Sequence, residues 1–178
     1  MESGYEKIVK KAIKGNKNAF EQLIKQHYEQ IYRTAYVYVH NEADALDVVQ
    51  EATYQALCSI YSLKNPEYFM TWFTKIIIRC SGQVLKKQSK VVPLSDDNLL
   101  QELPAAASNH DETMHILHAL NQLPENYRTV LILFYYHDYS IKTISEILGI
   151  PEGTVKTYLS RGKTALKKYF EGEEQSHG

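Results

Sequence analysis

The stretch that decides the fold runs from Ser140 to Lys168 and reads SIKTISEILGIPEGTVKTYLSRGKTALKK. It predicts a short helix, a turn through Gly149, Ile150 and Pro151, and a second, longer helix. Glycine can adopt the left-handed conformation that ends a helix, and proline is tolerated in the first turn of the next one. Two helices joined in this way are typical of a helix-turn-helix, whose second helix enters the major groove of DNA.

The two predicted helices carry apolar stripes that can pack together. These stripes are Ile141, Ile144, Ile147 and Leu148 on the first helix, and Val155, Leu159, Gly162 and Leu166 on the second. The side of the second helix left outward is polar and basic: Lys156, Thr157, Ser160, Arg161, Lys163, Thr164 and Lys168. A solvated amphipathic helix is the alternative interpretation, but the complete turn signature favours DNA binding.

Charge is distributed unevenly along the 178 residues, although the formal net charge is only −1. The segments 66–90 and 151–170 each hold five basic residues and one acidic residue. Between them, the segment 91–112 holds five acidic residues and no Lys or Arg. Two basic patches separated by an acidic spacer indicate nucleic-acid contacts more strongly than the total charge does.

The sequence predicts a soluble protein of the cytoplasm. The two cysteines, Cys58 and Cys80, are too few for a disulfide framework, and both are expected to be buried thiols. The N-terminus lacks the apolar core of a signal peptide. The longest apolar run, from Val130 to Tyr136, is too short to span a bilayer.

Helical periodicity dominates the chain, and no alternating strand pattern appears. Asn18 with Glu21 suggests a capping box for one helix, and Asn41 suggests the cap of the next. Asn65-Pro66 is expected to start a third long helix, with a buried face of Phe69, Trp72, Phe73, Ile76, Cys80 and Val84. Further helices are expected around residues 114–120 and from Pro124 onward, and the tail after Phe170 is polar.

The periodicity fails between Lys90 and His110, where two prolines, three consecutive alanines and several acids occur. This composition predicts a flexible acidic linker. The predicted fold class is therefore all-α, with two small helical domains, the second containing the helix-turn-helix. The expected boundaries are residues 1–89, the linker 90–110, and residues 111–172.

Beyond the helix-turn-helix, the chain as a whole resembles a known family, the extracytoplasmic-function sigma factors of bacterial RNA polymerase. The segments that carry the resemblance are FEQLIKQHYEQIYRTAY, DVVQEA at Asp47 to Ala52, FMTWFTKIIIRCSGQVLKK at Phe69 to Lys87, LPENYRTVLILFYYHDYS at Leu123 to Ser140, and ISEILGIPEGTVKTYLSRGKTAL. Their order and spacing cover nearly the whole chain. The resemblance implies a factor that directs core polymerase to stress-response promoters, recognises the −35 element, and recognises and melts the −10 element.

The resemblance assigns polymerase binding to Asp47, Gln50 and Glu51. On a helix, Asp44, Asp47, Glu51 and Gln55 form one stripe, while Leu46, Val49, Ala52, Ala56 and Ile60 are expected to face inward. The spacing alone favours a solvated helix face. In the family, the same motif docks on the clamp helices of the largest polymerase subunit.

The resemblance implies that a loop and the helix that follows it contact the −10 element. The residues are Lys64, Asn65, Tyr68, Arg79, Gln83, Lys86 and Lys87. Aromatic and amide groups in such a loop can stack on, or bond to, bases that have left the duplex. The alternative for Tyr61 and Tyr68 is packing at the edge of the core, and Trp72 is interpreted as core. The family often has Asn at position 79 and Asp at position 83, so Arg79 and Gln83 make this helix more basic than usual.

The −35 element is assigned to Lys156, Thr157, Tyr158, Ser160, Arg161 and Lys163 on the second helix of the helix-turn-helix. Basic side chains can reach phosphates or guanine edges, and hydroxyls can bond to bases or backbone. Tyr158 stands where the family frequently has Arg. It either contacts a thymine methyl group or pads the helix against its neighbour.

The implied partners are core RNA polymerase, through its clamp helices and flap, promoter DNA, and an anti-sigma factor, often membrane-tethered. The free chain is expected to be a monomer. No catalytic residue, cofactor or metal is expected. One alternative function is a free-standing dimeric helix-turn-helix regulator. A weaker one is a metalloenzyme around His110, His115 and His118, whose spacing more often belongs to surface histidines.

Overall fold

A computed structural model describes residues 3–90 and 110–176, with side chains for residues 3–88 and 115–172. Within these ranges the chain is helical and contains no strand. It divides into two compact units, Met1–Leu99 and Leu100–Gly178, each with its own core. The predicted linker, residues 90–110, lies almost wholly outside the described residues.

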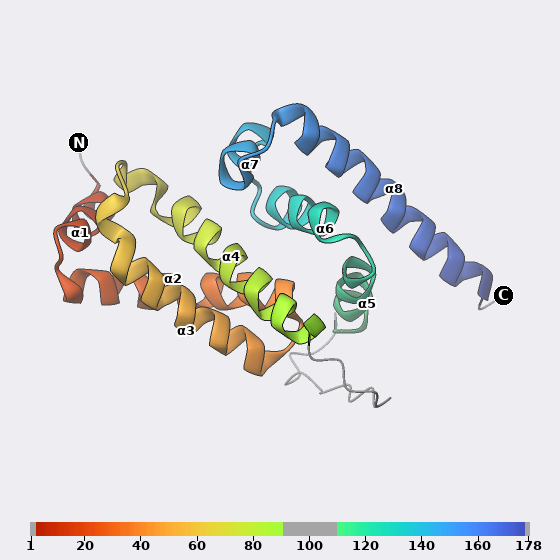
Figure 1. Cartoon of the computed structure of the whole chain (residues 1–178), viewed down its shortest axis with the longest axis horizontal. Helices are drawn as coiled ribbons and strands as arrows, with labels where there is room; N and C mark the ends of the chain where they lie inside the picture. Colours follow the sequence, from red (N-terminus) through yellow and green to blue (C-terminus); the bar gives the residue numbers. More distant parts are fainter. Residues whose placement is uncertain (1–2, 91–109, 177–178) are drawn as a thin grey trace. The chain divides into compact units, whose positions relative to one another are not determined.

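The N-terminal unit is built from four α-helices and two short 3-10 turns (Figure 1). These are α1 (Gly4–Ile13), α2 (Lys17–Val39), α3 (Glu42–Ser59), η1 (Ile60–Ser62), η2 (Pro66–Tyr68) and α4 (Phe69–Lys90). Helix α2 packs against α1, α3 and α4, and α3 also packs against α4. The largest of the fully buried side chains in this core are Leu23, Ile31, Phe69, Phe73 and Ile77.

Asparagine side chains cap α2 and α3 of this unit. The Asn41 oxygen accepts a hydrogen bond from the Asp44 N–H at 3.0 Å, which confirms the predicted cap of α3. The predicted capping box at Asn18 is wrong, because the Asn16 oxygen caps α2 by accepting from the Ala19 N–H at 2.9 Å. Asn65 precedes a 3-10 turn, so the third long helix begins three residues later than Pro66.

The buried faces differ from the sequence prediction at a few positions. Leu46, which was expected to face inward, is exposed. Val48 is buried in its place. Trp72 and Val84 on α4 are only half-buried. Cys80 is buried as predicted, but Cys58 is exposed, so the prediction of two buried thiols is wrong for one of them.

The C-terminal unit contains α5 (His110–Asn121), α6 (Glu125–Leu131), a π-helical turn η3 (Ile132–Tyr136), α7 (Ile141–Leu148) and α8 (Glu152–Ser176). Helix α8 packs against α5, α6 and α7. The fully buried side chains Val130, Leu133, Ile144 and Val155 form its centre. Helix α8 continues to Ser176 and so includes most of the polar tail after Phe170.

The turn between α7 and α8 has the predicted conformation. Gly149 ends α7 with φ 66°, in the left-handed region that favours glycine, and Pro151 directly precedes α8. Ser140 caps α7 by accepting from the Thr143 N–H at 3.1 Å. The Ser145 hydroxyl donates to the Ile150 carbonyl and so ties α7 to the turn. These contacts position α8 for the site described below.

Candidate functional site

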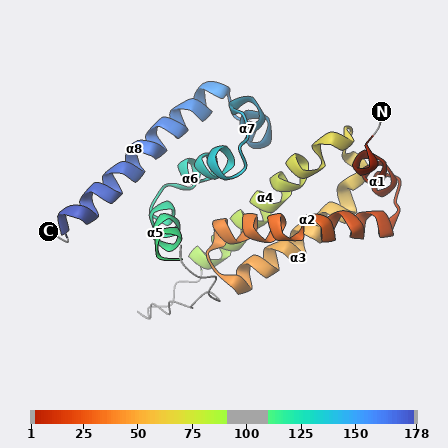
Figure 2. The same ribbon diagram turned by 180° about the vertical axis from the view of Figure 1, so that it is seen from behind.

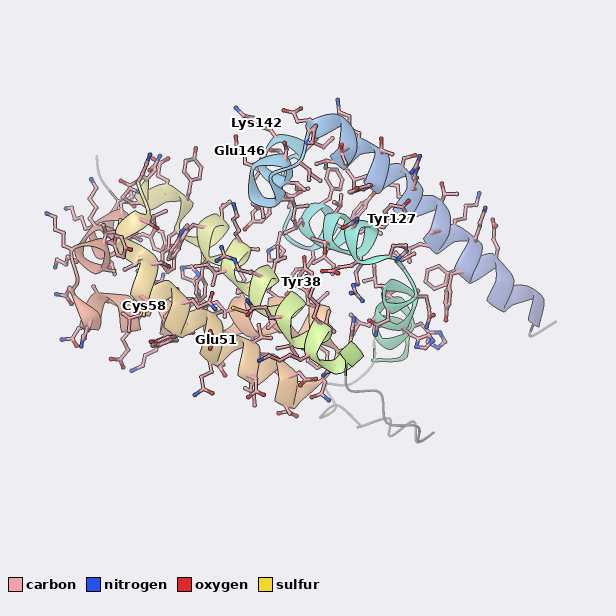
Figure 3. All side chains as sticks on the ribbon, viewed as in Figure 1. Tyr38, Glu51, Cys58, Tyr127, Lys142 and Glu146 are labelled. Atoms are coloured by element: carbon pink, nitrogen blue, oxygen red, sulfur yellow. The ribbon has the colours of Figure 1, made fainter. Side chains whose placement is uncertain are left out.

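The acidic stripe predicted on α3 is present on the surface of the N-terminal unit. Asp47, Gln50 and Glu51 are all exposed, and Glu51 accepts a hydrogen bond from the Gln55 side chain at 2.8 Å. Figure 3 labels Glu51 on this helix. The opposite side of α3 is buried, so the stripe is held at a fixed orientation and is available to a basic partner.

A groove of about 690 Å³ lies between α3 and α4. Its lining includes Asp44, Asp47, Gln50, Glu51 and Tyr54 from α3, and Cys80, Gln83, Lys87 and Gln88 from α4. The Gln88 amide donates to the Asp44 carboxylate across it. The structure therefore brings residues predicted for polymerase binding into one groove with Gln83 and Lys87, which were predicted for the −10 element.

The Cys80 thiol lines this groove, and charged groups of both helices affect its pKa. Burial raises the pKa of Cys80, and the nearby Glu51 carboxylate raises it further, while Arg79 acts in the opposite direction. Acidic and basic groups from the two helices thus act on the same atom. The thiol is held as a neutral group and is not an activated nucleophile.

The loop predicted for the −10 element presents its side chains to solvent. Tyr61 is 76% exposed and Tyr68 is 57% exposed, which argues against the alternative that they pack at the core edge. Lys64 and Asn65 are also exposed. The Asn65 oxygen accepts from the Glu67 N–H at 3.3 Å, so its amide group stays available as a donor.

The remaining residues predicted for the −10 element lie far from this loop. Arg79 is exposed at the middle of α4, and Gln83, Lys86 and Lys87 are exposed in its C-terminal half. At 1.5 Å per residue, Lys86 is about 27 Å along the helix from Tyr68. The set therefore follows the length of α4 and does not form one cluster.

Trp72 lies at the edge of the core between these two parts. Its ring is 6.1 Å from Phe69 and 6.5 Å from Phe73, centroid to centroid, and the side chain is half-buried. These contacts agree with the interpretation of Trp72 as a core residue, although its side chain is less buried than expected.

Helix α8 presents the residues predicted for the −35 element. Lys156, Thr157, Ser160, Arg161 and Lys163 are all exposed. The Thr157 hydroxyl donates to the Gly153 carbonyl at 2.9 Å, which leaves its oxygen as an acceptor. Val155 and Leu159 are buried on the other side of the helix, so the polar face points outward.

Tyr158 is placed differently from these neighbours. It is half-buried, and its ring lies 5.5 Å from the Tyr127 ring on α6, which Figure 3 labels. This position matches the padding alternative, and a base contact by Tyr158 stays a prediction. The structure also adds Tyr135, which sequence reasoning missed: the Lys163 ammonium lies 5.5 Å from the centre of its exposed ring.

Sequence reasoning also missed an apolar row beside the acidic stripe of α3. Leu46, Tyr54 and Leu57 are exposed on this helix, Tyr54 by 64%. With Gln50 they follow spacings of four, four and three, which places them on one side. Exposed aromatic and aliphatic groups bordered by charges are typical of a protein-binding surface.

Histidines do not assemble into a metal site among the described residues, which hold no group of three or more His, Cys, Asp or Glu suited to a metal ion. His115 and His118 are exposed on α5, and the side chain of His110 lies outside the described residues. His137 stacks on Tyr139 with 5.2 Å between ring centres, and its burial lowers its pKa to about 4.

Within the ranges described, no helix combines the length and the apolar character that crossing a membrane requires.

The geometry defines a class: an all-helical DNA-binding protein of two units, one with a helix-turn-helix and the other with an acidic helix beside an aromatic loop. Two family models match the same two regions. Sigma-70 region 2 matches residues 23–91, and sigma-70 region 4 matches residues 113–166.

Curated relatives agree with these matches over most of the chain. The RNA polymerase sigma factor SigV of Bacillus subtilis is 36% identical over 153 residues, 86% of this chain and 92% of the relative. The ECF RNA polymerase sigma factor SigW of the same organism is 30% identical over 182 residues, 94% and 97% of the two chains. The chain therefore belongs to the extracytoplasmic-function group of the sigma-70 family.

Solved structures with low sequence identity share the fold. CnrH in complex with the cytosolic domain of CnrY matches with a TM-score of 0.73 and 19% identity, over 96% of this chain and 99% of that one. The sigma factor RpoE in complex with the anti-sigma factor NepR, from Bartonella quintana, matches with a TM-score of 0.67 and 20% identity, over 85% and 96%.

Membership of this family settles the general function. The protein is a transcription initiation factor that directs RNA polymerase to specific promoters. The alternative of a free-standing dimeric regulator is not favoured, because the matches include region 2 as well as the helix-turn-helix region.

Proposed function

We propose a division of labour between the two units. The N-terminal unit, residues 1–89, docks on core polymerase through Asp47, Gln50 and Glu51, and its loop and α4 engage the −10 element. The C-terminal unit, residues 111–172, reads the −35 element with the outward face of α8. Residues 90–110 connect the two activities and keep the units on one chain.

One observation carries this proposal: α3 and the loop of the N-terminal unit expose different kinds of side chain from those on α8. The N-terminal unit exposes acids and apolar groups on α3, and tyrosines and an amide on its loop. The C-terminal unit exposes a basic and hydroxyl-bearing face on a regular helix. The first set suits a protein surface and unstacked bases, and the second suits the major groove of a duplex.

In this proposal the chain opens DNA by capture. Tyr61 and Tyr68 hold bases that have left the stack, and Asn65 donates a hydrogen bond to one of them. Captured bases shift the equilibrium of the duplex towards the open state, because the loop binds only that state. Synthesis of RNA belongs to the polymerase, so this chain needs no catalytic residue or cofactor of its own.

The proposal extends to regulation. One structure that shares the fold is a sigma factor in complex with an anti-sigma factor, and another is CnrH in complex with the cytosolic domain of CnrY. We infer a similar inhibitor for this chain, tethered to a membrane. It would cover the acidic stripe of α3 and the DNA-binding surfaces until a stress signal arrives. The free protein is proposed to be a monomer located in the cytoplasm.

In vitro transcription tests the proposal directly. Purified core polymerase is given genomic fragments with and without the full-length chain, and transcript starts are mapped. We expect new starts that appear only with the chain and share sequence elements near −10 and −35. Binding of the chain to DNA as a symmetric pair, with no new starts, would contradict it.

A further inference from the structure

The outward face of α8 carries hydroxyl groups along its middle. Thr157, Ser160 and Thr164 are exposed, and at about 100° per residue they fall within a sector of about 60°. This sector lies on the opposite side of the helix from the buried Val155 and Leu159. Figures 1 and 2 show α5, α6 and α7 along one side of α8, so no described element of this unit covers the other side. We call Thr157, Ser160 and Thr164 the hydroxyl row.

Cations border the hydroxyl row on both sides. Lys156 and Lys163 lie along one edge and Arg161 and Lys168 along the other, all exposed and within about 60° of the row. The stretch 156–168 contains no acidic residue. Phosphates line both sides of the major groove and base edges form its floor, so this arrangement places cations at the phosphates and hydroxyls at the bases.

The acids of α8 with described side chains lie beyond the two ends of the hydroxyl row. Glu152 is in the first turn of the helix, five residues before Thr157. Glu171 follows Thr164 by seven residues and pairs with Lys167 at 3.6 Å. Neither acid interrupts the part of the face where hydroxyls and cations alternate.

The two threonines of the hydroxyl row use their protons inside the helix. The Thr157 hydroxyl donates to the Gly153 carbonyl at 2.9 Å, and the Thr164 hydroxyl donates to the Ser160 carbonyl at 3.0 Å. A hydroxyl has a single proton to donate, and a carbonyl can only accept it. Both threonines therefore present only acceptor lone pairs to a partner on the outward face.

Gly153 and Gly162, both on α8, differ in what surrounds them. A Cβ at Gly162 would lie 2.9 Å from Cδ1 of Leu131, so the packing of α6 explains that glycine. A Cβ at the exposed Gly153 would meet nothing within 4 Å, so packing within the chain gives no reason for it. Gly153 lies in line with Thr157, one turn earlier, and a glycine lets a partner approach the backbone closely. The open space at Gly153 thus admits base edges to the start of the row.

We propose that Thr157 and Thr164 read the −35 element as hydrogen-bond acceptors. The inference rests on the proposed function of α8 at that element. Each hydroxyl faces, on one strand, a base that carries an amino group in the major groove, either adenine at N6 or cytosine at N4. Guanine and thymine present O6 or O4 at the same place, and these oxygens repel another acceptor. The two threonines therefore separate amino-bearing from keto-bearing bases.

The test uses holoenzyme assembled from core polymerase and the full-length chain. The probe is a duplex library built on a promoter mapped by in vitro transcription, with the base pairs around −35 randomised, and bound duplexes are sequenced. The two threonines are seven residues apart, about 10 Å along the helix, or roughly three base-pair steps of 3.4 Å. In the wild type we expect two positions at about this spacing where A or C is preferred to G or T on one strand.

Valine variants assign each position, because valine keeps the shape of threonine and removes the acceptor. Thr157→Val should abolish the preference at one position and Thr164→Val at the other. The matched control is Thr154→Val, the same substitution on the same helix about 60° outside the hydroxyl row, and it should leave both preferences intact. Unchanged circular dichroism and core binding verify that the variants fold.

Base analogues then test the amino group itself. Purine replaces adenine, or 2-pyrimidinone replaces cytosine, at each assigned position, which removes only the amino group. Wild-type affinity should fall about fivefold per position, as expected for one hydrogen bond. Thr157→Val should lose nothing further from the analogue at its own position, but should still respond to the analogue at the position of Thr164.

Each other outcome overturns the inference. If the analogues weaken the wild type and both valine variants equally, the hydroxyls do not meet the amino groups. If the valine variants lose a preference but the analogues have no effect on the wild type, the hydroxyls act as donors. The proposed function of α8 fails separately: a library without any enriched sequence near −35 means that α8 does not read this element, and both proposals are then wrong.

Discussion

The loop between α3 and α4 and the outward face of α8 are both assigned to promoter DNA, yet they are built in opposite ways. The loop is irregular and exposes its aromatic rings, Tyr61 and Tyr68. Helix α8 is regular and turns its tyrosine, Tyr158, against α6 while exposing cations and hydroxyls. Rings are useful where bases are unstacked, and a basic helix is useful where the duplex is intact. Under the proposed function, this contrast means that each unit is matched to a different state of the same DNA.

The largest effect should come from reversing charge on α3, which would separate polymerase docking from both DNA functions. Asp47→Lys with Glu51→Lys places cations where a basic partner is proposed, and like charges at an interface cost several kcal/mol. We expect core affinity to fall by about 100-fold, or about 2.7 kcal/mol. Fluorescence anisotropy with labelled chain measures this.

The matched control for that pair is Glu21→Lys with Glu29→Lys on α2, which reverses two exposed charges of the same unit. The control should bind core polymerase within about twofold of wild type, because exposed pairs contribute less than about 1 kcal/mol. Equal losses in both variants would mean that net charge, and not the α3 stripe, governs docking.

The second effect should fall on promoter opening alone. Tyr61→Ala with Tyr68→Ala removes two stacking surfaces, each contributing about 1–3 kcal/mol per base. At the low end of that range, about 2 kcal/mol in total, the open complex should form about 30-fold less readily, measured by permanganate reactivity of unpaired thymines. Binding to duplex that carries only the −35 element should not change, and a parallel loss there would contradict the division between the units.

Sequence patterns predicted helix α8 well because its two faces are set locally. Val155 and Leu159 repeat at helical spacing, so the outward cations follow without any knowledge of tertiary contacts. Gly149 and Pro151 mark the preceding turn by backbone chemistry alone. The helix-turn-helix is therefore a feature that one segment of sequence specifies.

The phase of α3 was harder to predict, because adjacent valines blur the buried side. Val48 and Val49 are both buried, and Leu46 is about 100° from Ala45 around the helix, outside the covered sector. Cys58 lies on the side opposite Ala45 by the same geometry. A small error in the predicted direction of the buried side of α3 therefore placed Leu46 inward instead of Val48.

The groove between α3 and α4 could not be predicted from local patterns. Asp44 and Gln88 are 44 residues apart, and only the packing of the two helices brings their side chains together. The cap at Asn16, in contrast, had a signal: Gly15 adopts φ 92° and ends the preceding turn, which leaves Asn16 as the first residue able to cap α2.

Acid should weaken the C-terminal unit more than the N-terminal unit. Burial lowers the pKa of His137 to about 4, so the unfolded chain, with a pKa near 6.5, binds the proton first. Stability is then lost as pH falls from about 6.5 towards 4, by about 1 kcal/mol between pH 7.5 and 5.5 for a ring that still partly reaches water. The melting temperature of this unit should fall by about 4–8 °C.

Two spectroscopic signals together distinguish unfolding of the two units in the pH experiment. Trp72 is the single tryptophan, so its fluorescence follows the N-terminal unit, while circular dichroism follows the helices of both. His27 also has a lowered pKa from burial, so a small acid effect on the N-terminal unit is expected as well. His137→Gln should abolish most of the pH dependence of unfolding of the C-terminal unit. If that pH dependence persists in the variant, a group other than His137 causes it.

A smaller effect is expected for single cations on α8. Lys156→Ala or Arg161→Ala should each reduce −35-dependent transcription several-fold. If each residue neutralises one phosphate, the slope of log affinity against log salt for duplex should drop by roughly 0.9 per residue. An unchanged slope with altered base preference would place the residue at a base edge, and would sharpen the comparison between backbone and base contacts.

The smallest effect should come from Tyr135, whose ring holds the Lys163 ammonium at 5.5 Å. Such exposed cation–π contacts contribute about 0.5–1 kcal/mol, so Tyr135→Leu should weaken duplex binding about two- to fivefold by releasing the Lys163 ammonium from its position over the ring. Tyr135→Phe keeps the ring and should bind like wild type, while Lys163→Ala should make the Tyr135→Leu change silent. Losses that simply add in the double variant would mean that the ring and the ammonium act independently, and that Tyr135 contacts the duplex by itself.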